Sequence, residues 1–143
     1  MNRIVFVGGV WDLLHPGHLR FLKMAQQLGD ELHVGVLTDE AVEEYKPPAV
    51  MTFSERFSVM CGLSIPRDVW TLQHSDATEV LKRLGALPSC AGVILAHGTD
   101  WTPGWEIGQT WIQDQGYPFV LLPYTEGISS TIIKDRILQR VGG

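Results

Sequence analysis

The sequence predicts an α/β fold in which one doubly wound domain, residues 1–143, contains a five-stranded parallel sheet. Short apolar runs alternate with amphipathic segments along the whole chain, which is typical of a parallel sheet with helices on both faces. Hydrophobic residues make up 45% and charged residues 19% of the 143 residues, so the chain can bury a real core. No repeat or low-complexity stretch interrupts this pattern.

Each predicted strand is a short apolar run, as expected for strands that are buried on both faces. In chain order the strands are expected at residues 3–8, 32–37, 69–72, 93–96 and 119–122. Parallel strands bring their carboxyl ends to one edge of the sheet, where ligands of such folds bind. The segments that follow the strands are therefore the first places to look for a site.

The helices are predicted from their start and stop signals. They are expected at residues 16–29, 38–45, 53–64, 76–85, 105–115 and 129–141. Pro16 suits the first helical position, because a proline has no N–H to leave unpaired there. Thr52 and Glu55 form a capping box. Asp76 and Ser129 (or its neighbour Ser130) provide the N-cap oxygen that a helix start requires.

The charge and the cysteines exclude several functions. The net charge of −5, without a basic block, excludes nucleic acid as an expected partner. No stretch of about 18 apolar residues is present, so no membrane span is expected. The N-terminus runs directly into a strand without a signal peptide, which favours a cytoplasmic location.

Cys61 and Cys90 suit buried apolar positions, and neither a disulfide nor a zinc site is expected from them.

The most informative feature is a pair of histidines, His15 and His18, directly after the first strand. A strand-to-helix turn offers unpaired backbone N–H groups at the positive end of a helix dipole, and these attract phosphate. Gly17 has no side chain and would let a phosphate approach the backbone. We expect a phosphate site with two imidazoles aimed at it. A histidine metal pair is the alternative, although no third ligand is evident nearby.

Two cations follow the second strand. Lys46 precedes Pro47-Pro48 in a stiff loop, from which it could bring positive charge to a phosphate transition state. Arg56 lies in the first turns of the helix expected over residues 53–64. Taken alone, each residue also fits an ordinary solvated surface side chain.

The segment after the fourth strand is His97-Gly98-Thr99-Asp100-Trp101. Gly98 permits a tight turn, and Asp100 could hold a base, a ribose or a metal-bound water. Trp101 and Trp105 could stack on a base or on an acceptor molecule. A packed aromatic loop without a ligand is the alternative.

The segment after the fifth strand is Thr125-Glu126-Gly127-Ile128-Ser129-Ser130-Thr131. Hydroxyl and N–H groups at the start of a helix suit a second phosphate cradle. An ordinary N-cap, which Ser129 would satisfy by itself, is the alternative. All of these segments meet at one edge of the predicted sheet, and together they indicate a nucleotide or phosphate site.

These motifs resemble those of a known family. The first turn, Gly9-Val10-Trp11-Asp12 followed by His15-Pro16-Gly17-His18, resembles the G-x-F-D-x-x-H-x-G-H signature of cytidylyltransferases in the HxGH nucleotidyltransferase superfamily. Ethanolamine-phosphate cytidylyltransferase is similar at Thr38-Asp39-Glu40, Lys46-Pro47-Pro48, Thr52…Glu55-Arg56 and His97-Gly98-Thr99-Asp100. Glycerol-3-phosphate cytidylyltransferase is similar over residues 98–101. Residues 124–131 also resemble the R-T-E-G-I-S-T-T pattern of that enzyme. The likeness extends roughly from residue 3 to residue 138.

The resemblance implies a Rossmann-like homodimer that uses CTP and Mg²⁺. It assigns catalytic roles to His15, His18 and Lys46. The implied nucleotide-binding residues are Gly9, Val10, Trp11, Asp12, Gly17, His97, Gly98, Asp100, Thr125, Gly127, Ile128, Ser129, Ser130 and Thr131. The implied acceptor-binding residues are Lys46, Arg56, Trp101 and Tyr124. No side chain is expected to bind the Mg²⁺, which the phosphates of CTP would hold.

The sequence departs from the family pattern at two arginines. Tyr124 replaces the arginine that opens R-T-E-G-I-S-T-T, and Ser64 replaces an arginine eight positions beyond Arg56. Arg67 is the nearest residue that could take the place of the second one. Two positive charges are thus lost where the family binds phosphate or acceptor, which points to a remodelled acceptor pocket.

The expected reaction is transfer of CMP from CTP to a small phosphate acceptor, of the phosphoethanolamine or glycerol 3-phosphate kind, with release of pyrophosphate. A phosphonate acceptor, such as aminoethylphosphonate, hydroxyethylphosphonate or phosphonoformate, is the first alternative. An ATP-dependent adenylyltransferase of the same superfamily, a catalytically silent nucleotide-binding protein and a histidine-metal hydrolase are the others.

Overall fold

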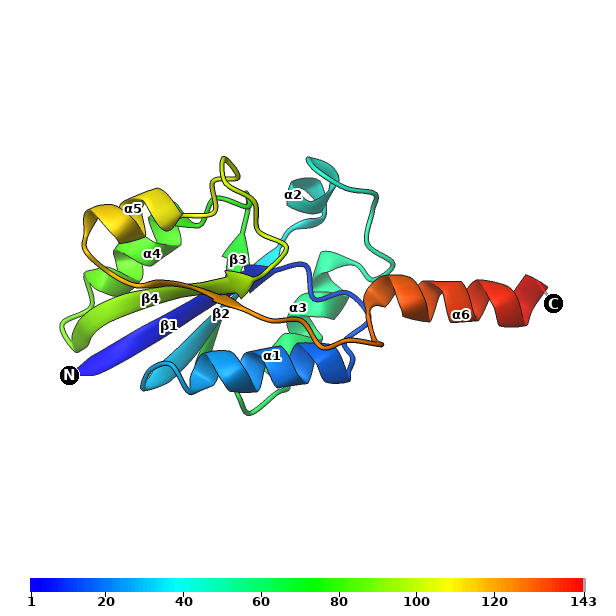
Figure 1. The fold of residues 1–143 in the computed structure, drawn as a ribbon, viewed down its shortest axis with the longest axis horizontal. Coiled ribbons are helices and arrows are strands. Elements are labelled where there is room, and N and C mark those ends of the chain that lie inside the picture. Colours follow the sequence, from blue (N-terminus) through cyan, green and yellow to red (C-terminus); the bar gives the residue numbers. More distant parts are fainter. Residues whose placement is uncertain (143) are drawn as a thin grey trace.

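The computed structural model describes residues 1–142 and contains a five-stranded sheet in which all strands are parallel (Figure 1). The strands are β1 (Asn2–Gly9), β2 (Glu31–Leu37), β3 (Asp68–Leu72), β4 (Cys90–Gly98) and β5 (Phe119–Leu122). Their spatial order is β3-β2-β1-β4-β5. The chain runs outward from β1 through β2 to β3 and then returns to β4 on the other side of β1. The predicted α/β fold is confirmed.

The helices are α1 (Pro16–Gln26), α2 (Asp39–Glu43), α3 (Phe53–Cys61), α4 (Thr78–Gly85), α5 (Gln109–Asp114) and α6 (Ser130–Gly142). All six lie within predicted helical segments or within one residue of them, but several are shorter than expected. Pro16 begins α1, and Thr52 and Glu55 form the predicted capping box of α3. The helix expected from residue 105 begins only at Gln109, because Gly108 before it has a left-handed φ of 112°.

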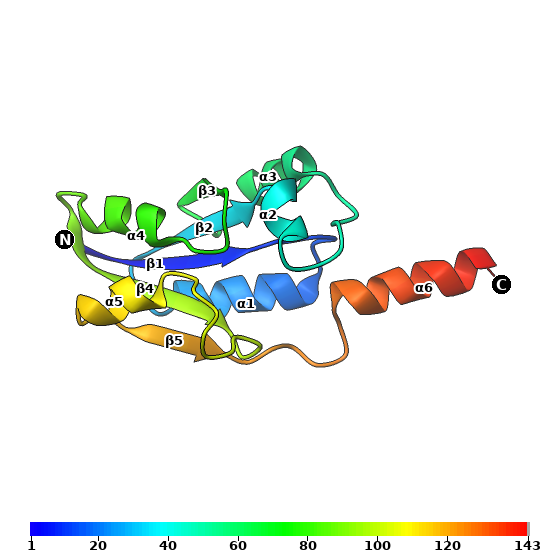
Figure 2. The ribbon, with the colours of Figure 1, turned by 90° about the horizontal axis from the view of Figure 1, so that it is seen from above.

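Alternating residues of β1 separate two hydrophobic layers. Ile4 and Phe6 face the cluster formed with α2, α4 and α5. Val5 and Val7 face the cluster formed with α1 and α3. Helices therefore cover both faces of the sheet, and the carboxyl end of β1, where the strand order changes direction, is left to the loops (Figures 1 and 2).

The last helix, α6, extends away from the sheet (Figure 2). None of its described residues is buried, and Ile137, Leu138 and Val141 are exposed. None of the helices within residues 1–142 combines the length and apolarity needed to cross a bilayer. The prediction of a buried Cys61 was wrong. Its side chain is exposed because α3 turns that face to solvent, whereas Cys90 is half-buried, and both thiols are free.

Candidate functional site

A cleft of about 560 Å³ lies at the carboxyl ends of β1 and β4. Its volume is in the range of small-molecule binding sites. The turn before α1, the loop after α2, the loop after β4 and the start of α6 all contribute to its walls. Of the predicted site residues, the cleft is lined by Gly9, Val10, Trp11, Asp12, His15, Gly17, His18, Lys46, His97, Gly98, Asp100, Tyr124, Thr125, Ile128, Ser129, Ser130 and Thr131.

The two histidines form a stacked pair at the start of α1. Their ring centroids are 3.8 Å apart, and the rings are inclined by 27°. The backbone N–H of Gly17 donates to Nδ1 of His15 at 3.0 Å, and the backbone N–H of His15 donates to Nδ1 of His18 at 3.2 Å. Since each Nδ1 accepts a hydrogen bond, each neutral ring carries its proton on Nε2. The capping box thus fixes the tautomer and leaves an N–H donor on both rings.

Both imidazoles are neutral near pH 7. Burial, together with the nearby His15, lowers the pKa of His18 to about 4, and the charge of Asp12 opposes this only in part. Burial also lowers the pKa of His15. Neutral Nε2–H groups can donate to phosphate oxygens without first losing or gaining a proton, so the pair is prepared to bind an anion across the neutral pH range.

This pKa predicts a stability that depends on pH. Between pH 6.5, the ordinary pKa of histidine, and about pH 4, the unfolded chain protonates His18 while the folded chain does not. The unfolded state then binds more protons, so the free energy of unfolding falls as the pH falls through this window. Urea unfolding at a series of pH values should show a steeper fall for the wild type than for His18→Asn, which does not titrate there. An equal dependence of the free energy of unfolding on pH in the two proteins would contradict the lowered pKa of His18.

Glycine and tryptophan shape the turn around these rings. A Cβ at Gly17 would lie 2.8 Å from Cε1 of His15, so the missing side chain makes room for the imidazole. Trp11 has a φ of 60°, which is uncommon for a residue other than glycine. Its indole is buried, donates to the carbonyl of Gly35 at 2.9 Å and lies 5.7 Å from the ring of His18. The indole therefore packs against the ring of His18.

Asp12 ties three parts of the cleft together. Its buried carboxylate accepts hydrogen bonds from the backbone N–H groups of Val50 and Met51 at 2.8 and 3.0 Å. Its backbone carbonyl accepts a hydrogen bond from the hydroxyl of Ser130, and its Oδ2 is 3.7 Å from Nζ of Lys134. These contacts hold the end of the loop that carries Lys46 and the start of α6 against the histidine turn.

The loop after β5 adds hydroxyl groups. The Ser129 hydroxyl accepts from the backbone N–H of Ile132 at 3.1 Å, as an N-cap does, so its capping role is observed. The buried Oγ1 of Thr125 has no hydrogen-bond partner within the described residues. Such an orphaned hydroxyl at the wall of a cleft is suited to a ligand contact. Gly127 has a φ of 81°, forms the turn, and does not itself line the cleft.

Arg56 is not where its predicted role would place it. Its side chain is fully buried and outside the cleft lining. The guanidinium donates to the carbonyls of Val10, Leu37 and Met51 and to Oδ1 of Asp39, at 2.8 to 3.1 Å. With its donors engaged in this way, Arg56 holds the loops together and does not face an acceptor.

Two other predicted positions also lie outside the cleft. Trp101 packs edge-on against Phe119, with ring centroids 4.9 Å apart, and belongs to the wall of the hydrophobic core. Arg67 lies 3.9 Å from Glu31, the first residue of β2, and thus at the opposite edge of the sheet from the cleft. Arg67 therefore does not line the cleft.

The sequence did not single out Tyr45 or Lys134 as site residues, yet both line the cleft. Tyr45 precedes Lys46, whose Nζ lies 5.5 Å from the centre of the tyrosine ring. Lys134 is four residues after Ser130, and this helical spacing was the available signal that both would face the same side.

Comparison with known proteins assigns the family. The family described as "Cytidylyltransferase-like" matches residues 6–136. The Bifunctional protein HldE of Trichlorobacter lovleyi is 31% identical over 141 residues, which are 97% of this chain and 28% of that protein. The Bifunctional protein HldE of Nitrosococcus oceani is 34% identical over 137 residues, with 94% and 28% covered. The chain thus spans little more than a quarter of the length of these relatives.

A solved structure shares the fold. The lipopolysaccharide core biosynthesis protein of Thermoplasma volcanium GSS1 superposes with a TM-score of 0.67 over 87% of this chain and 98% of that protein, at 21% identity. This likeness agrees with the parallel sheet and the strand order described above. Because the family match extends over nearly the whole sheet and the histidine turn, the chain belongs to the cytidylyltransferase-like family of nucleotidyltransferases.

Proposed function

We propose that the protein is a CTP-dependent cytidylyltransferase that joins CMP to a small phosphate or phosphonate acceptor and releases pyrophosphate. The stacked imidazole pair carries the proposal, because it presents two Nε2–H donors beside the first turn of α1. Lys46, Ser129 and Thr131 line the same cleft, whereas the hydroxyl of Ser130, which also lines it, already donates to the carbonyl of Asp12. Donors of this kind, around a cleft of nucleotide size, suit a triphosphate.

In this reaction an oxygen of the acceptor attacks the α-phosphorus of CTP in line. The bond from the α-phosphorus to the bridging oxygen breaks, and that oxygen leaves with the electron pair as part of pyrophosphate. A phosphate or phosphonate acceptor is already ionised near neutral pH, so no strong general base is required. Catalysis is then positioning and electrostatic stabilisation. His15 and His18 donate to the oxygens on which charge develops, and Lys46 adds positive charge.

Mg²⁺ would enter with the nucleotide as part of the substrate. No cluster of three histidine, cysteine or acidic side chains suited to a metal is found within residues 1–142. Both oxygens of Asp12, the buried carboxylate beside the histidines, accept backbone hydrogen bonds. In this proposal the phosphates of CTP supply the ligands of the Mg²⁺. We also propose that the protein forms a homodimer, as its resemblance to cytidylyltransferases implies.

The choice of nucleotide gives the direct test. We expect pyrophosphate release with CTP to exceed that with ATP, GTP or UTP by at least about tenfold in kcat/KM, in assays with Mg²⁺ and a panel of acceptors. The resemblance of residues 124–131 to the R-T-E-G-I-S-T-T pattern supports CTP. The panel contains phosphoethanolamine, glycerol 3-phosphate, aminoethylphosphonate, hydroxyethylphosphonate and phosphonoformate.

Three outcomes would contradict the proposal in different ways. Turnover with ATP at least equal to that with CTP would indicate an adenylyltransferase. CTP binding without pyrophosphate release from any acceptor would indicate a silent nucleotide-binding protein. Nucleotide hydrolysis that is lost after chelation and is not restored by Mg²⁺ alone would indicate a histidine-metal hydrolase.

A further inference from the structure

The turn between β1 and α1 has a backbone that its own residues disfavour. The φ of Trp11 is 60° and that of Leu13 is 49°, so both lie in the left-handed region. A residue other than glycine adopts this region at a cost in energy, which persists only where the surrounding contacts offset it. Contacts outside the turn must therefore hold Trp11 in place.

One hydrogen bond joins the indole of Trp11 to the middle of the sheet. Its Nε1–H donates to the carbonyl of Gly35 in β2 at 2.9 Å, and the residue is buried. Because β2 pairs with β1 on one side and with β3 on the other, its backbone belongs to the most stable part of the fold. Gly9 leaves room for the ring, since a Cβ there would lie 2.9 Å from Cε2 of the indole.

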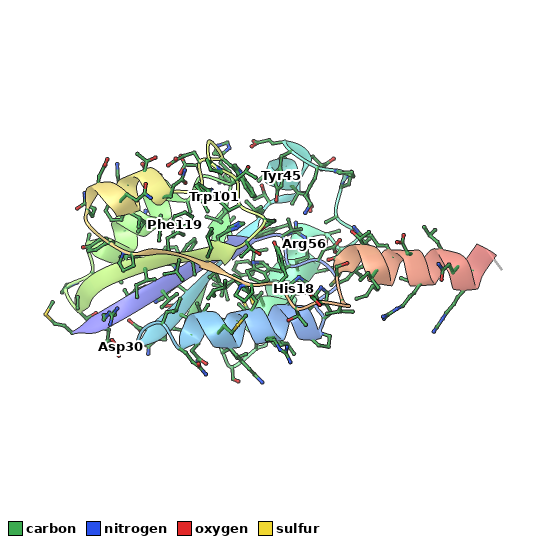
Figure 3. All side chains as sticks on the ribbon, viewed as in Figure 1. His18, Asp30, Tyr45, Arg56, Trp101 and Phe119 are labelled. Atoms are coloured by element: carbon green, nitrogen blue, oxygen red, sulfur yellow. The ribbon has the colours of Figure 1, made fainter. Side chains whose placement is uncertain are left out.

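The indole links His18 to this strand. His18 lies in the first turn of α1 (Figure 3). Its Nδ1 accepts from the backbone of His15, and its ring stacks on the ring of His15, so these two contacts stay within one turn. The indole of Trp11, by contrast, lies 5.7 Å from the centre of the His18 ring at an angle of 59°, and its own partner is 24 residues away in the sequence.

We propose that Trp11 is a positioning residue for His18, because its hydrogen bond to Gly35 holds the indole against the imidazole and so fixes where Nε2 points. The capping bonds determine which nitrogen of His18 faces outward. The indole limits how far the first turn of α1 can shift relative to the sheet. A displacement of about 1 Å in such a group can cost about 10²-fold in rate. This inference rests on the proposed function, in which His18 donates to a phosphate oxygen.

A direct contact with the nucleotide is the alternative role for Trp11, since the residue lines the cleft. Only 8% of its surface is exposed, however, and its single donor is already bonded to the carbonyl of Gly35. An indole has no other polar hydrogen to offer to a ligand. The contacts of Trp11 therefore favour an effect that passes through His18.

Loss of the indole N–H gives the kinetic test. Replacement of Trp11 by 3-benzothienylalanine keeps the bicyclic shape but has sulfur in place of the N–H. We expect kcat for pyrophosphate release with CTP and Mg²⁺ to fall about tenfold or more, and KM for CTP to stay within about threefold. Trp11→Phe, which also lacks the donor, should change kcat in the same direction. An unchanged kcat with a raised KM for CTP would make Trp11 a nucleotide contact and overturn the proposal.

Trp70→Phe is the matched control. Trp70, in β3, also donates an indole hydrogen bond, from Nε1 to Nδ1 of His33 at 3.1 Å, and it lies outside the cleft lining. We expect this variant to keep both kcat and KM. An equal fall of kcat in Trp70→Phe would trace the effect to general loosening of the fold and overturn the proposal. Circular dichroism at the assay temperature shows which variants are folded, and the benzothienyl variant decides the test if Trp11→Phe is not.

The pKa of His18 gives a readout that needs no nucleotide. Burial is the main reason why this pKa lies at about 4, and the indole forms part of the cover over the ring. In Trp11→Phe water gains access to the imidazole, so NMR titration of the free protein should place the pKa at about 5 or higher. Trp70→Phe should keep the wild-type pKa. An unchanged pKa of His18 in Trp11→Phe would overturn the proposal.

The two proposals fail in distinguishable ways. If CTP released no pyrophosphate with any acceptor of the panel, the proposed function would fall, and the NMR titration would still decide whether the indole holds its place on the His18 ring. If both variants of Trp11 kept the wild-type kcat, the cytidylyltransferase would stand and the positioning role would fall.

Discussion

His18→Ala lowers kcat/KM by at least about 10²- to 10³-fold in the pyrophosphate-release assay, because it removes an Nε2–H donor from the site of developing charge. The stacked geometry and the neutral state of the ring, with its pKa near 4, make this donor available at neutral pH. The loss should be expressed in kcat as well as in KM, since the contact strengthens as charge accumulates on the leaving group.

Two variants separate this role from helix capping. His18→Asn keeps an acceptor near the position of Nδ1, which caps α1 through the backbone N–H of His15, but it lacks the outer donor. We expect the midpoint of its urea unfolding to lie near that of the wild type, and its activity to be as low as that of His18→Ala. His18→Gln places its amide near the position of Nε2 and should recover part of the activity. Near-normal turnover of His18→Ala would remove this residue from the mechanism.

Arg56→Met lowers the free energy of unfolding by about 3 kcal/mol or more, because it leaves buried carbonyl groups without donors. The guanidinium donates to the carbonyls of Val10, Leu37 and Met51, which belong to the turn after β1, the end of β2 and the loop before α3. The measurement is urea unfolding followed by circular dichroism. A loss below about 1 kcal/mol would contradict the role that the structure gives to this residue.

The control for this variant is Asp39→Asn, which removes the ion pair between Asp39 and Arg56 but keeps the guanidinium. The Asp39 carboxylate is 2.9 Å from Nη2 of Arg56 but is 44% exposed, so water can replace the contact. Asp39→Asn should therefore cost less than about 1 kcal/mol. If the two substitutions had equal effects, the ion pair, and not the carbonyl contacts, would account for the stability that Arg56 provides.

The layered fold was predictable because its signals are local. The apolar run of β1 and Pro16 after it indicated a strand, a turn and a helix start, and this placed His15 and His18 at the edge of the sheet. The capping box at Thr52 is a pattern within four residues and was predicted for the same reason. Local periodicity and capping therefore sufficed for the elements and for one wall of the site.

Tertiary contacts were not predictable in this way. Nothing near Arg56 in the sequence reveals that carbonyls as distant as Val10 converge on it. The sequence likewise does not reveal that the ring of His15 lies against Gly17, where a Cβ would come within 2.8 Å of its Cε1. Lys134 reaches Asp12 across more than a hundred residues, and such a contact depends on how α6 meets the first turn. These features depend on how the helices and strands pack together, which the spacing of residues in the sequence does not reveal.

A crystal structure with CTP and Mg²⁺ tests the central claim most directly. We expect the triphosphate in the cleft after β1, with Nε2 of His15 and of His18 within hydrogen-bond distance of phosphate oxygens and both Nδ1 atoms still accepting from the backbone. A triphosphate bound elsewhere, with the two rings out of contact with it, would contradict the account.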